Sequence, residues 1–202
     1  MKTKILSIAT ILFVVFSISS KSFAVSNNND VTTTLTDMSN INKIEVHGNV
    51  QLFISNGVSD KVKVYDSYYS QNALVQEQNG VLRISSYKAE KLVVWVTVAD
   101  LRGISAYDNA TVESFGKFSG LDFNLSLNNN ASASFDMDCA EANIALNDDA
   151  KANISGMASE SSIVVNQAAT LNSTQFYAER LTQKRITPVV TAKVEADELA
   201  LN

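Results

Sequence analysis

Residues 125–133 read LSLNNNASA, and residues 144–152 read IALNDDAKA, which is the same pattern 19 residues later. The pattern occurs again one period earlier and one period later, and a weaker copy lies at residues 184–192. From Ala110 to Val190 the aligned small residues are spaced by 21, 19, 19 and 21 residues. A period of about 20 residues is typical of solenoids, in which each repeat forms one coil stacked on its neighbours.

Within each copy the apolar residues fall at every second position. The column four residues before the aligned small residue holds Ala106, Leu127, Leu146, Val165 and Ile186. This alternation is the side-chain period of a β-strand, and no apolar face with a 3.6-residue period occurs in the repeat. The pattern therefore predicts an all-β fold, a single-stranded parallel β-helix with about 20 residues per coil and three short strands in each coil.

Asn and Asp recur at one corner of each copy. Two neighbouring columns hold Tyr107, Asn128, Asn147, Asn166 and Thr187, and Asp108, Asn129, Asp148, Gln167 and Pro188. Asn and Asp tolerate left-handed backbone and bind their own main chain, so they favour sharp bends. Stacked coils would repeat these side chains about every 4.8 Å as an amide ladder. Such a column could face a ligand, and the candidate residues are Tyr107, Asp108, Asn128, Asn129, Asn147, Asp148 and Asn166.

The first half of the domain is less regular than the second. Residues 44–54 and 92–98 alternate between apolar and polar side chains. Asn79-Gly80 stands between two further alternating runs, which is a strong hairpin signal. We therefore expect an irregular, hairpin-containing N-terminal part, followed by regular coils from about Leu101.

The N-terminus has the pattern of an export signal. Lys2 and Lys4 precede an apolar run at residues 5–18, and Ser22-Phe23-Ala24 supplies a small-x-small cleavage pattern. The run is shorter than the roughly 20 residues that cross a bilayer, although an uncleaved anchor is the alternative. We predict a signal peptide over residues 1–24, with no transmembrane span after its removal. The Asn- and Ser-rich residues 25–40 are expected to form a flexible leader, and residues 41–202 a single domain.

Composition excludes several classes of protein. The chain has 202 residues and a net charge of −5, and loss of residues 1–24 removes three lysines and no acids, which gives −8. This acidity excludes a nucleic-acid binder of the usual basic kind. One Cys and one His exclude an intramolecular disulfide, a thiolate-rich zinc site and most His-dependent catalysis. We expect Cys139 to be an inert packed thiol, with a reactive thiol as the alternative.

The densest acidic cluster consists of Asp136, Asp138, Asp148 and Asp149. Paired carboxylates can cleave glycosidic bonds, and β-helix scaffolds can host such chemistry. The column of Asp108, Asn129 and Asp148 could also contribute oxygen ligands to calcium, but it lacks a fixed loop signature. We expect solvated surface charge, no catalytic residue, no cofactor and no metal. Weak calcium binding and a polysaccharide-degrading enzyme are the alternatives.

The remaining candidates are isolated polar residues. His47 has no partnered nucleophile nearby in the sequence, so we expect a structural role for it. Arg180, Lys184 and Arg185 are expected to form a solvated rim.

Three segments of the first half resemble a known family. Residues 44–52 read IEVHGNVQL, residues 79–84 read NGVLRI and residues 92–98 read LVVWVTV. Together they are similar to the opening of the putative auto-transporter adhesin, head GIN domain family, over about residues 41–202. The family's corners are usually of the Ser-Gly-Ala-Ser type, and here Asn or Asp replaces the corner Gly. The resemblance implies a right-handed parallel β-helix in a periplasmic or cell-surface setting, and it brings no catalytic residue.

These expectations combine into a functional hypothesis. We expect an exported, non-enzymatic, adhesin-like module that binds a glycan or a protein of the cell envelope or surface. It would be periplasmic, outer-membrane-associated or extracellular, and it would not bind nucleic acid. The alternative is a structural envelope protein that assembles without a ligand, as a homo-oligomer through the open ends of the β-helix.

Overall fold

The computed structural model describes residues 32–35, 38–65 and 73–187. Within these residues the chain forms β-strands joined by turns and bends, and no helix occurs, so the all-β prediction is confirmed. The strands are β1 (Thr32–Leu35), β2 (Lys43–Gly48), β3 (Val50–Asn56), β4 (Lys61–Tyr65), β5 (Ala73–Gln78), β6 (Val81–Ser86), β7 (Leu92–Val98), β8 (Gly103–Ala106), β9 (Thr111–Ser114), β10 (Phe118–Leu127), β11 (Ser132–Leu146), β12 (Lys151–Asn166) and β13 (Thr170–Ile186).

Some of the sequence predictions fall outside the described residues. The signal peptide expected at residues 1–24 and the C-terminal residues 188–202 are among these. Within the segment expected to be a leader, Thr32–Leu35 form β1, which pairs antiparallel with β4. None of the described residues forms a helix long and apolar enough to cross a membrane.

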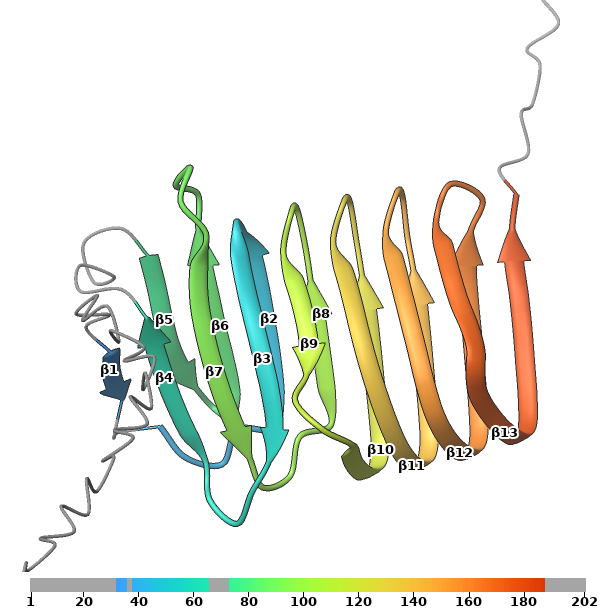
Figure 1. Cartoon of the computed structure of the whole chain (residues 1–202), viewed down its shortest axis with the longest axis horizontal. Helices are drawn as coiled ribbons and strands as arrows, with labels where there is room; N and C mark the ends of the chain where they lie inside the picture. Colours follow the sequence, from blue (N-terminus) through green and yellow to red (C-terminus); the bar gives the residue numbers. More distant parts are fainter. Residues whose placement is uncertain (1–31, 36–37, 66–72, 188–202) are drawn as a thin grey trace, which may run out of the picture.

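The strands curl into two facing layers (Figure 1). The β3 layer consists of β4, β7, β3 and β9, and it continues into the first half of each long strand from β11 to β13. The β2 layer consists of β5, β6, β2 and β8, and it continues into the second half of each long strand from β10 to β13. Apolar side chains from both layers fill the space between them.

Successive coils of the second half pair in parallel, as the repeat predicts. Leu125 pairs with Ile144 and Ile144 pairs with Ile163, each 19 residues further along the chain. The pairing of Ile104 with Leu125 spans the predicted 21 residues. The columns of the sequence repeat are therefore columns of neighbouring residues across the sheet from β8 to β12.

Each coil has two sides and not the three short strands expected from the repeat. The strand β11 runs unbroken from Ser132 to Leu146, and its burial alternates in two phases. Ala140 and Glu141 are both exposed, and this pair marks the point where the strand bends from one layer to the other. The bends of β10 to β13 line one long edge of the molecule, whereas the Asn-rich corners line the opposite edge (Figure 1). Continuous pairing through the bend removes the need for a second turn.

The N-terminal half departs from a single-stranded parallel helix, because the sheet is mixed. The strand pairs β1–β4, β4–β7 and β5–β6 are antiparallel. The β5–β6 hairpin turns at Asn79 and Gly80, where φ is 55° and 80°, so the predicted hairpin is confirmed. Strands β2 and β3, which come first in the chain among the inner coils, lie between the later pairs β6/β7 and β8/β9.

The register of the last coil differs from the repeat by one residue. The repeat columns predict Ile186 opposite Val165, but the structure pairs Arg185 with Val165. The reason is a β-bulge in β13, because the register shifts by one between the partners of Asn153 and Ser155. The extra residue moves every later residue of β13 to the neighbouring position.

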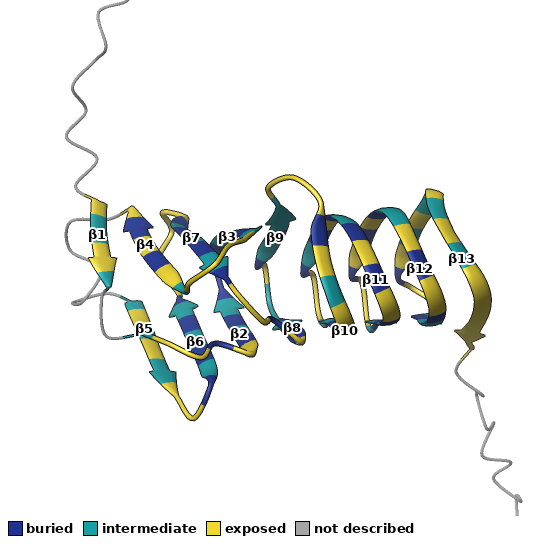
Figure 2. Cartoon of the chain, turned by 90° about the horizontal axis from the view of Figure 1, so that it is seen from below, coloured by how far each residue is buried: buried dark blue, intermediate teal, exposed yellow. Residues whose placement is uncertain are grey.

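This shift places polar residues at the end of the apolar columns. Gln183, and not Lys184, pairs with Ile163. Arg185 donates through Nη1 to the carbonyl oxygens of Gln167 and Ala169, at 3.3 and 3.4 Å. A further coil would satisfy these carbonyls with its own backbone, so Arg185 supplies the donors that this last described coil otherwise lacks. The exposed surface of β13 contrasts with the buried stripes of the inner strands (Figure 2).

The core between the layers is dominated by aliphatic side chains, with one aromatic group. The rings of Phe118, Phe123 and Phe135 pack together near the bend of the coils, with centroids 4.7 to 5.5 Å apart. Ala110, Ala131 and similar small residues are fully buried beside the corners. Large rings fill the wide side of each coil and alanines fill the narrow side, which gives the even packing that a thin core needs.

The thiol of Cys139 faces this core, and burial raises its pKa to about 11. Only the thiolate reacts with disulfide reagents, so we expect the native protein to react with a colorimetric disulfide about a hundredfold more slowly at pH 8 than the urea-unfolded protein. The measurement is the rate of thiol release in the two states. Rapid stoichiometric reaction of the native protein would mean that Cys139 is accessible.

Candidate functional site

The corner residues predicted from the sequence lie one after another along one edge of the molecule. The backbone is left-handed at Asp108, Asn129 and Asp148, with φ of 61°, 58° and 54°, as their residue types predict. Because the coils stack in register, these corners form a continuous line of polar side chains (Figure 1). We call Tyr107, Asp108, Asn128, Asn129, Asn147, Asp148 and Asn166 the corner ridge.

Side chains of the corner ridge link each coil to the one before it. The N–H of Gly48 donates to Oδ2 of Asp108 at 3.0 Å, and the N–H of Asp108 donates to Oδ1 of Asn129 at 3.2 Å. The N–H of Asn129 donates in turn to Oδ2 of Asp148 at 3.0 Å. Three successive backbone donors at the corners are thus satisfied by the next coil.

A second ladder consists of amide side chains. Asn147 donates through Nδ2 to Oδ1 of Asn128 at 2.8 Å, and the Asn128 amide donates to the carbonyl oxygen of Ala106 at 3.4 Å. Asn166 differs, because its Oδ1 accepts from the backbone N–H of Gln167 at 2.6 Å. The corner ridge therefore stabilises the stack as well as presenting polar atoms to solvent.

We expect Asn129→Ala to lower the free energy of unfolding by about 1–2 kcal/mol. The variant loses the acceptor for the Asp108 N–H and places a residue with a higher left-handed cost at a φ of 58°. Asn130→Ala is the control, because Asn130 is exposed and makes only a long side-chain contact with Asn109, at 3.5 Å. Urea unfolding followed by circular dichroism measures both variants, and equal losses would contradict the ladder's contribution.

The corner ridge continues onto an aromatic pair. The rings of His47 and Tyr107 stack with centroids 4.4 Å apart and planes 1° apart. Beside them Tyr87 is 74% exposed, and desolvation together with the charge of Asp108 raises the pKa of its hydroxyl. The sequence analysis included Tyr107 but assigned His47 only a structural role. The signal was present, since Val46 pairs with Ala106 and each is followed by one of the two rings.

An ion cluster lies on the same outer surface. The carboxylate of Glu45 contacts Nζ of Lys43 at 2.9 Å and Nε of Arg83 at 3.1 Å. The hydrogen bond from Lys43 and the two positive charges lower the pKa of Glu45, although partial burial opposes the shift. Glu45 is therefore ionised at neutral pH and neutralises part of the basic charge around it.

The acidic residues singled out in the sequence are divided between two parts of the molecule. Asp136 and Asp138 lie on the outward-facing side of β11 in the β3 layer, whereas Asp148 and Asp149 lie at the following corner. Within the described residues no three His, Cys, Asp or Glu side chains gather closely enough to hold a metal ion. Arg180 of the basic group forms a surface ion pair with Glu160, at 2.9 Å.

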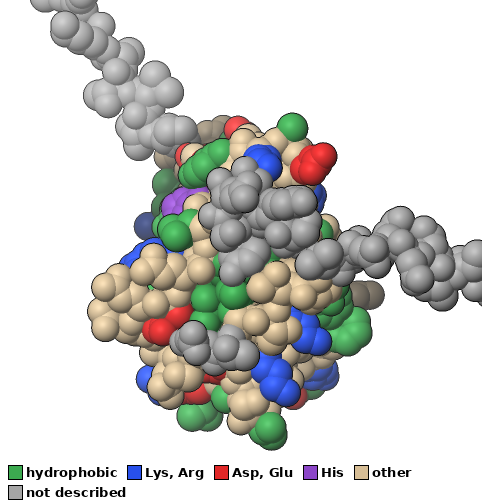
Figure 3. Space-filling view, turned by 90° about the vertical axis from the view of Figure 1, so that its left-hand side faces the viewer, with side chains coloured by type: hydrophobic (Ala, Val, Ile, Leu, Met, Phe, Trp, Pro, Cys, Tyr) green, Lys and Arg blue, Asp and Glu red, His purple; other side chains and the backbone are tan. Residues whose placement is uncertain are grey.

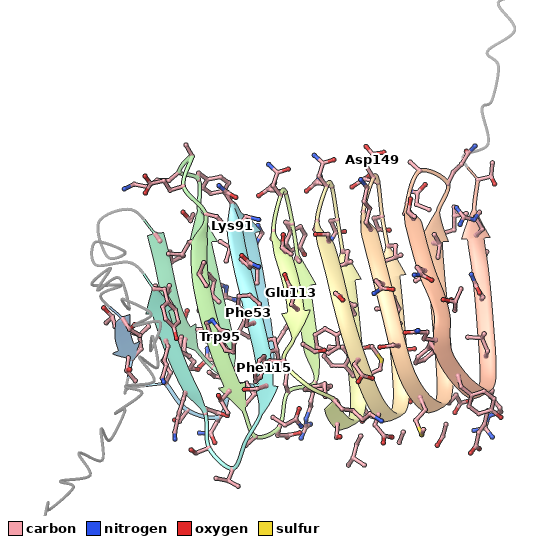
Figure 4. All side chains as sticks on the ribbon, in the orientation of Figure 1. Phe53, Lys91, Trp95, Glu113, Phe115 and Asp149 are labelled. Carbon is pink, nitrogen blue, oxygen red and sulfur yellow. The ribbon has the colours of Figure 1, made fainter. Side chains whose placement is uncertain are left out.

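A second aromatic cluster, which the sequence analysis missed, lies on the outer surface of the β3 layer. Phe53 and Trp95 stack with centroids 4.6 Å apart, and Phe115 meets Trp95 edge-on at 5.1 Å (Figure 4). Glu113 lies beside them and accepts from the Gln51 amide at 3.0 Å. Strand alternation could have identified Phe53 and Trp95, because each stands between two buried neighbours and must face outward.

The N-terminal end of the molecule is formed by β1, β4 and β5. Seen end-on, hydrophobic, basic and polar side chains are mixed over this end (Figure 3). Lys61 and Lys63 of β4 and the outward residues of β5 contribute to its polarity. The strongest concentration of ordered polar groups is therefore along the corner ridge and the adjoining β2 layer.

Comparison with known proteins gives a family and a set of similar folds. Residues 40–197 match the sequence model of the family described as putative auto-transporter adhesin, head GIN domain. No curated protein matches the chain.

The fold is similar to several crystal structures. A putative adhesin from Bacteroides fragilis has a TM-score of 0.63 at 15% identity, over 77% of this chain and 76% of that one. A putative adhesin from Parabacteroides distasonis has a TM-score of 0.57 at 14% identity, over 77% and 78%. A putative lipid binding protein from the same species has a TM-score of 0.57 at 9% identity, over 76% and 77%. At these identities the likeness is one of fold.

Proposed function

Since the chain belongs to the putative auto-transporter adhesin, head GIN domain family, we propose that it is an exported, non-enzymatic module that binds a glycan or a protein of the cell envelope or surface. Its stacked parallel coils form a right-handed parallel β-helix closed at one end by antiparallel strands. Residues 1–24 direct export and are removed, which leaves the protein in the periplasm, at the outer membrane or outside the cell.

The observation that carries this proposal is the corner ridge with its aromatic end. Amide and carboxylate side chains repeat at the spacing of the coils, and His47 and Tyr107 add a stacked ring pair at 4.4 Å. Convergent amides and rings on a rigid support are the usual components of a recognition surface. The acids that could have served catalysis are divided between a strand and a corner, which favours binding over bond cleavage.

The test is binding of purified protein to a glycan array and to envelope proteins, each with and without calcium. We expect saturable binding to at least one defined component and a loss of about tenfold in affinity for Tyr107→Ser. Leu121→Ser is the matched control, because Leu121 is 79% exposed at the opposite edge of the coils. Absence of binding under all conditions would overturn the proposal.

A second function, assembly of a structural envelope protein without a ligand, is favoured by β13. Among the described strands β13 pairs only with β12, so one of its edges offers backbone groups for further pairing. Leu181 and Tyr177 are 52% and 67% exposed on this strand. Against assembly, Gln183 and Arg185 occupy the last positions of the apolar columns.

Sedimentation velocity over a wide concentration range separates the two functions. Growth of oligomers at micromolar concentration in the absence of ligand, abolished by a charged substitution such as Leu181→Lys, would favour assembly. A monomer at all concentrations would leave ligand binding as the function.

A further inference from the structure

A cavity of about 260 Å³ opens on the outer surface of the β2 layer, between β2, β8 and β10. Its walls include the side chains of Asn42, Lys43, Arg102 and Asn124, and Gly103 forms its floor. The cavity is slightly smaller than the roughly 300–1,000 Å³ of pockets for drug-sized ligands, so it suits one or two rings of a small ligand.

The register of the strands explains why the surface is hollow here. Gly103 lies between Lys43 of β2 and Asn124 of β10, and it has no side chain to fill the space between these longer residues. Two residues along, Ser105 lies between Glu45 and Ser126, so the floor stays low. The cavity is therefore fixed by the backbone pairing and does not depend on a side-chain rotamer.

The hollow continues along the stack as a shallow furrow. Ser126 is followed across the sheet by Ala145 and then by Val164, all half-buried and all facing outward. Asn124 and Asn143 line one side of this row. The corner ridge lines the other side, where Asn128, Asn147 and Asn166 follow one another.

The charges around the cavity are already paired. Nζ of Lys43 lies 2.9 Å from Glu45, and Nη2 of Arg102 lies 2.7 Å from Asp100. The nearby carboxylates of Asp100 and Asp122 raise the pKa of Arg102, which stays charged and compensated. What remains for a ligand is a set of amides and hydroxyls without excess charge, and such groups complement uncharged hydroxyl groups.

The sheet backbone offers little to a peptide on this face. The N–H and C=O groups of β2, β8 and β10 are paired within the parallel sheet, so strand addition requires an edge. A ligand lying along the furrow crosses the strands at a right angle and meets side chains only. The spacing of about 4.8 Å between coils is comparable to the advance of one ring in an extended sugar chain.

We propose that this cavity binds one sugar ring of a neutral oligosaccharide and that the furrow holds the following rings of the same chain. The inference rests on the proposed binding function and specifies its ligand class and its position. Amides of both furrow walls bind the sugar hydroxyls, and the floor of Gly103, Ser105 and Ser126 lets a ring approach the sheet closely.

The experiment is a titration of the isotope-labelled protein with cello-, chitin- and manno-oligosaccharides of increasing length, followed by backbone amide shifts. We expect saturable shifts at Gly103, Ser105 and Ser126, and tighter binding of the longer members of one series. Oligogalacturonides, which are acidic, are the comparison for ligand charge and should bind more weakly.

Gly103→Val fills the cavity and is expected to weaken binding about tenfold or more. A Cβ atom at this position lies 3.4 Å from the nearest backbone oxygen, that of Asn124, so the fold accommodates it. Ser134→Val is the matched control, because Ser134 is an exposed strand residue on the outer surface of the β3 layer. Unfolding curves confirm that both variants are folded.

The outcomes separate this inference from the proposed function. If oligosaccharides bind but Gly103→Val has no effect, the site is wrong and the binding function stands. If acidic chains bind better, or if only an envelope protein binds, the ligand class is wrong. If the protein binds no envelope component at all, both proposals fail.

Discussion

Gly48→Ala is expected to lower the free energy of unfolding by about 4 kcal/mol or more, enough to unfold much of the protein. Gly48 joins β2 to β3 with a φ of 82°, in the left-handed region. A Cβ atom there runs into the carbonyl oxygen of Ser86 and comes within 2.9 Å of its carbonyl carbon. This carbonyl cannot move away, because it accepts a 2.6 Å hydrogen bond from the N–H of Asn49.

The matched control for this prediction is Gly116→Ala. Gly116 has a similar φ of 79°, but nothing lies within 4 Å of a Cβ atom built on it. It should lose only the backbone term, about 1 kcal/mol. Urea unfolding monitored by circular dichroism gives both values. Similar losses for the two variants would show that the close approach to Ser86 contributes nothing.

Phe135→Ala is expected to cost about 3–5 kcal/mol. The ring of Phe135 is 1% exposed and contacts both Phe123, at a centroid distance of 5.0 Å, and Phe118, at 5.5 Å. Its removal leaves a cavity at the bend of the coils, where the paired strands on both sides prevent collapse.

Phe115→Ala removes the same atoms from the surface. Phe115 is 65% exposed and meets only the edge of the aromatic cluster on the β3 layer, so we expect a loss below about 1 kcal/mol. Thermal unfolding by calorimetry, with circular dichroism to verify the fold, measures the pair. A small loss for Phe135→Ala would mean that the bend repacks freely.

The parallel pairing of the second half could be predicted because one repeat carries three consistent signals. Alternation gives the strand, the column of Leu127, Leu146 and Val165 gives the neighbours, and Asn or Asp gives the corner. The positive φ at Asn129 confirms the last of these. Each signal depends on residues within one period, so no long-range information was needed.

The order of the first coils could not be predicted in this way. The pairing of Ile44 with both Leu82 and Ile104 joins segments far apart in the sequence, and nothing local distinguishes it from a simple sequence of coils. The bulge in β13 was missed for a related reason. A single inserted residue leaves the alternating pattern intact on both sides and only changes which face each residue occupies.

The candidate site was predicted in part. The corner ridge follows directly from the Asn and Asp columns, and its residues lie together in the structure. Its aromatic end was missed because His47 belongs to a coil that is inserted between later ones. The cavity at Gly103 was missed because its hollow depends on the lengths of neighbouring side chains on other strands.

The insertion of β2 and β3 between later coils constrains how the polypeptide acquires its shape as it is made. Neither lateral neighbour of residues 43–56 exists until the ribosome has added the segments that form β6 to β9. Growth by simple addition of turns from the N-terminus is therefore impossible for this part. The early ribbon must wait, with its apolar side chains unsheltered, for partners roughly 40 to 60 residues downstream, and closing loops of that size slows folding.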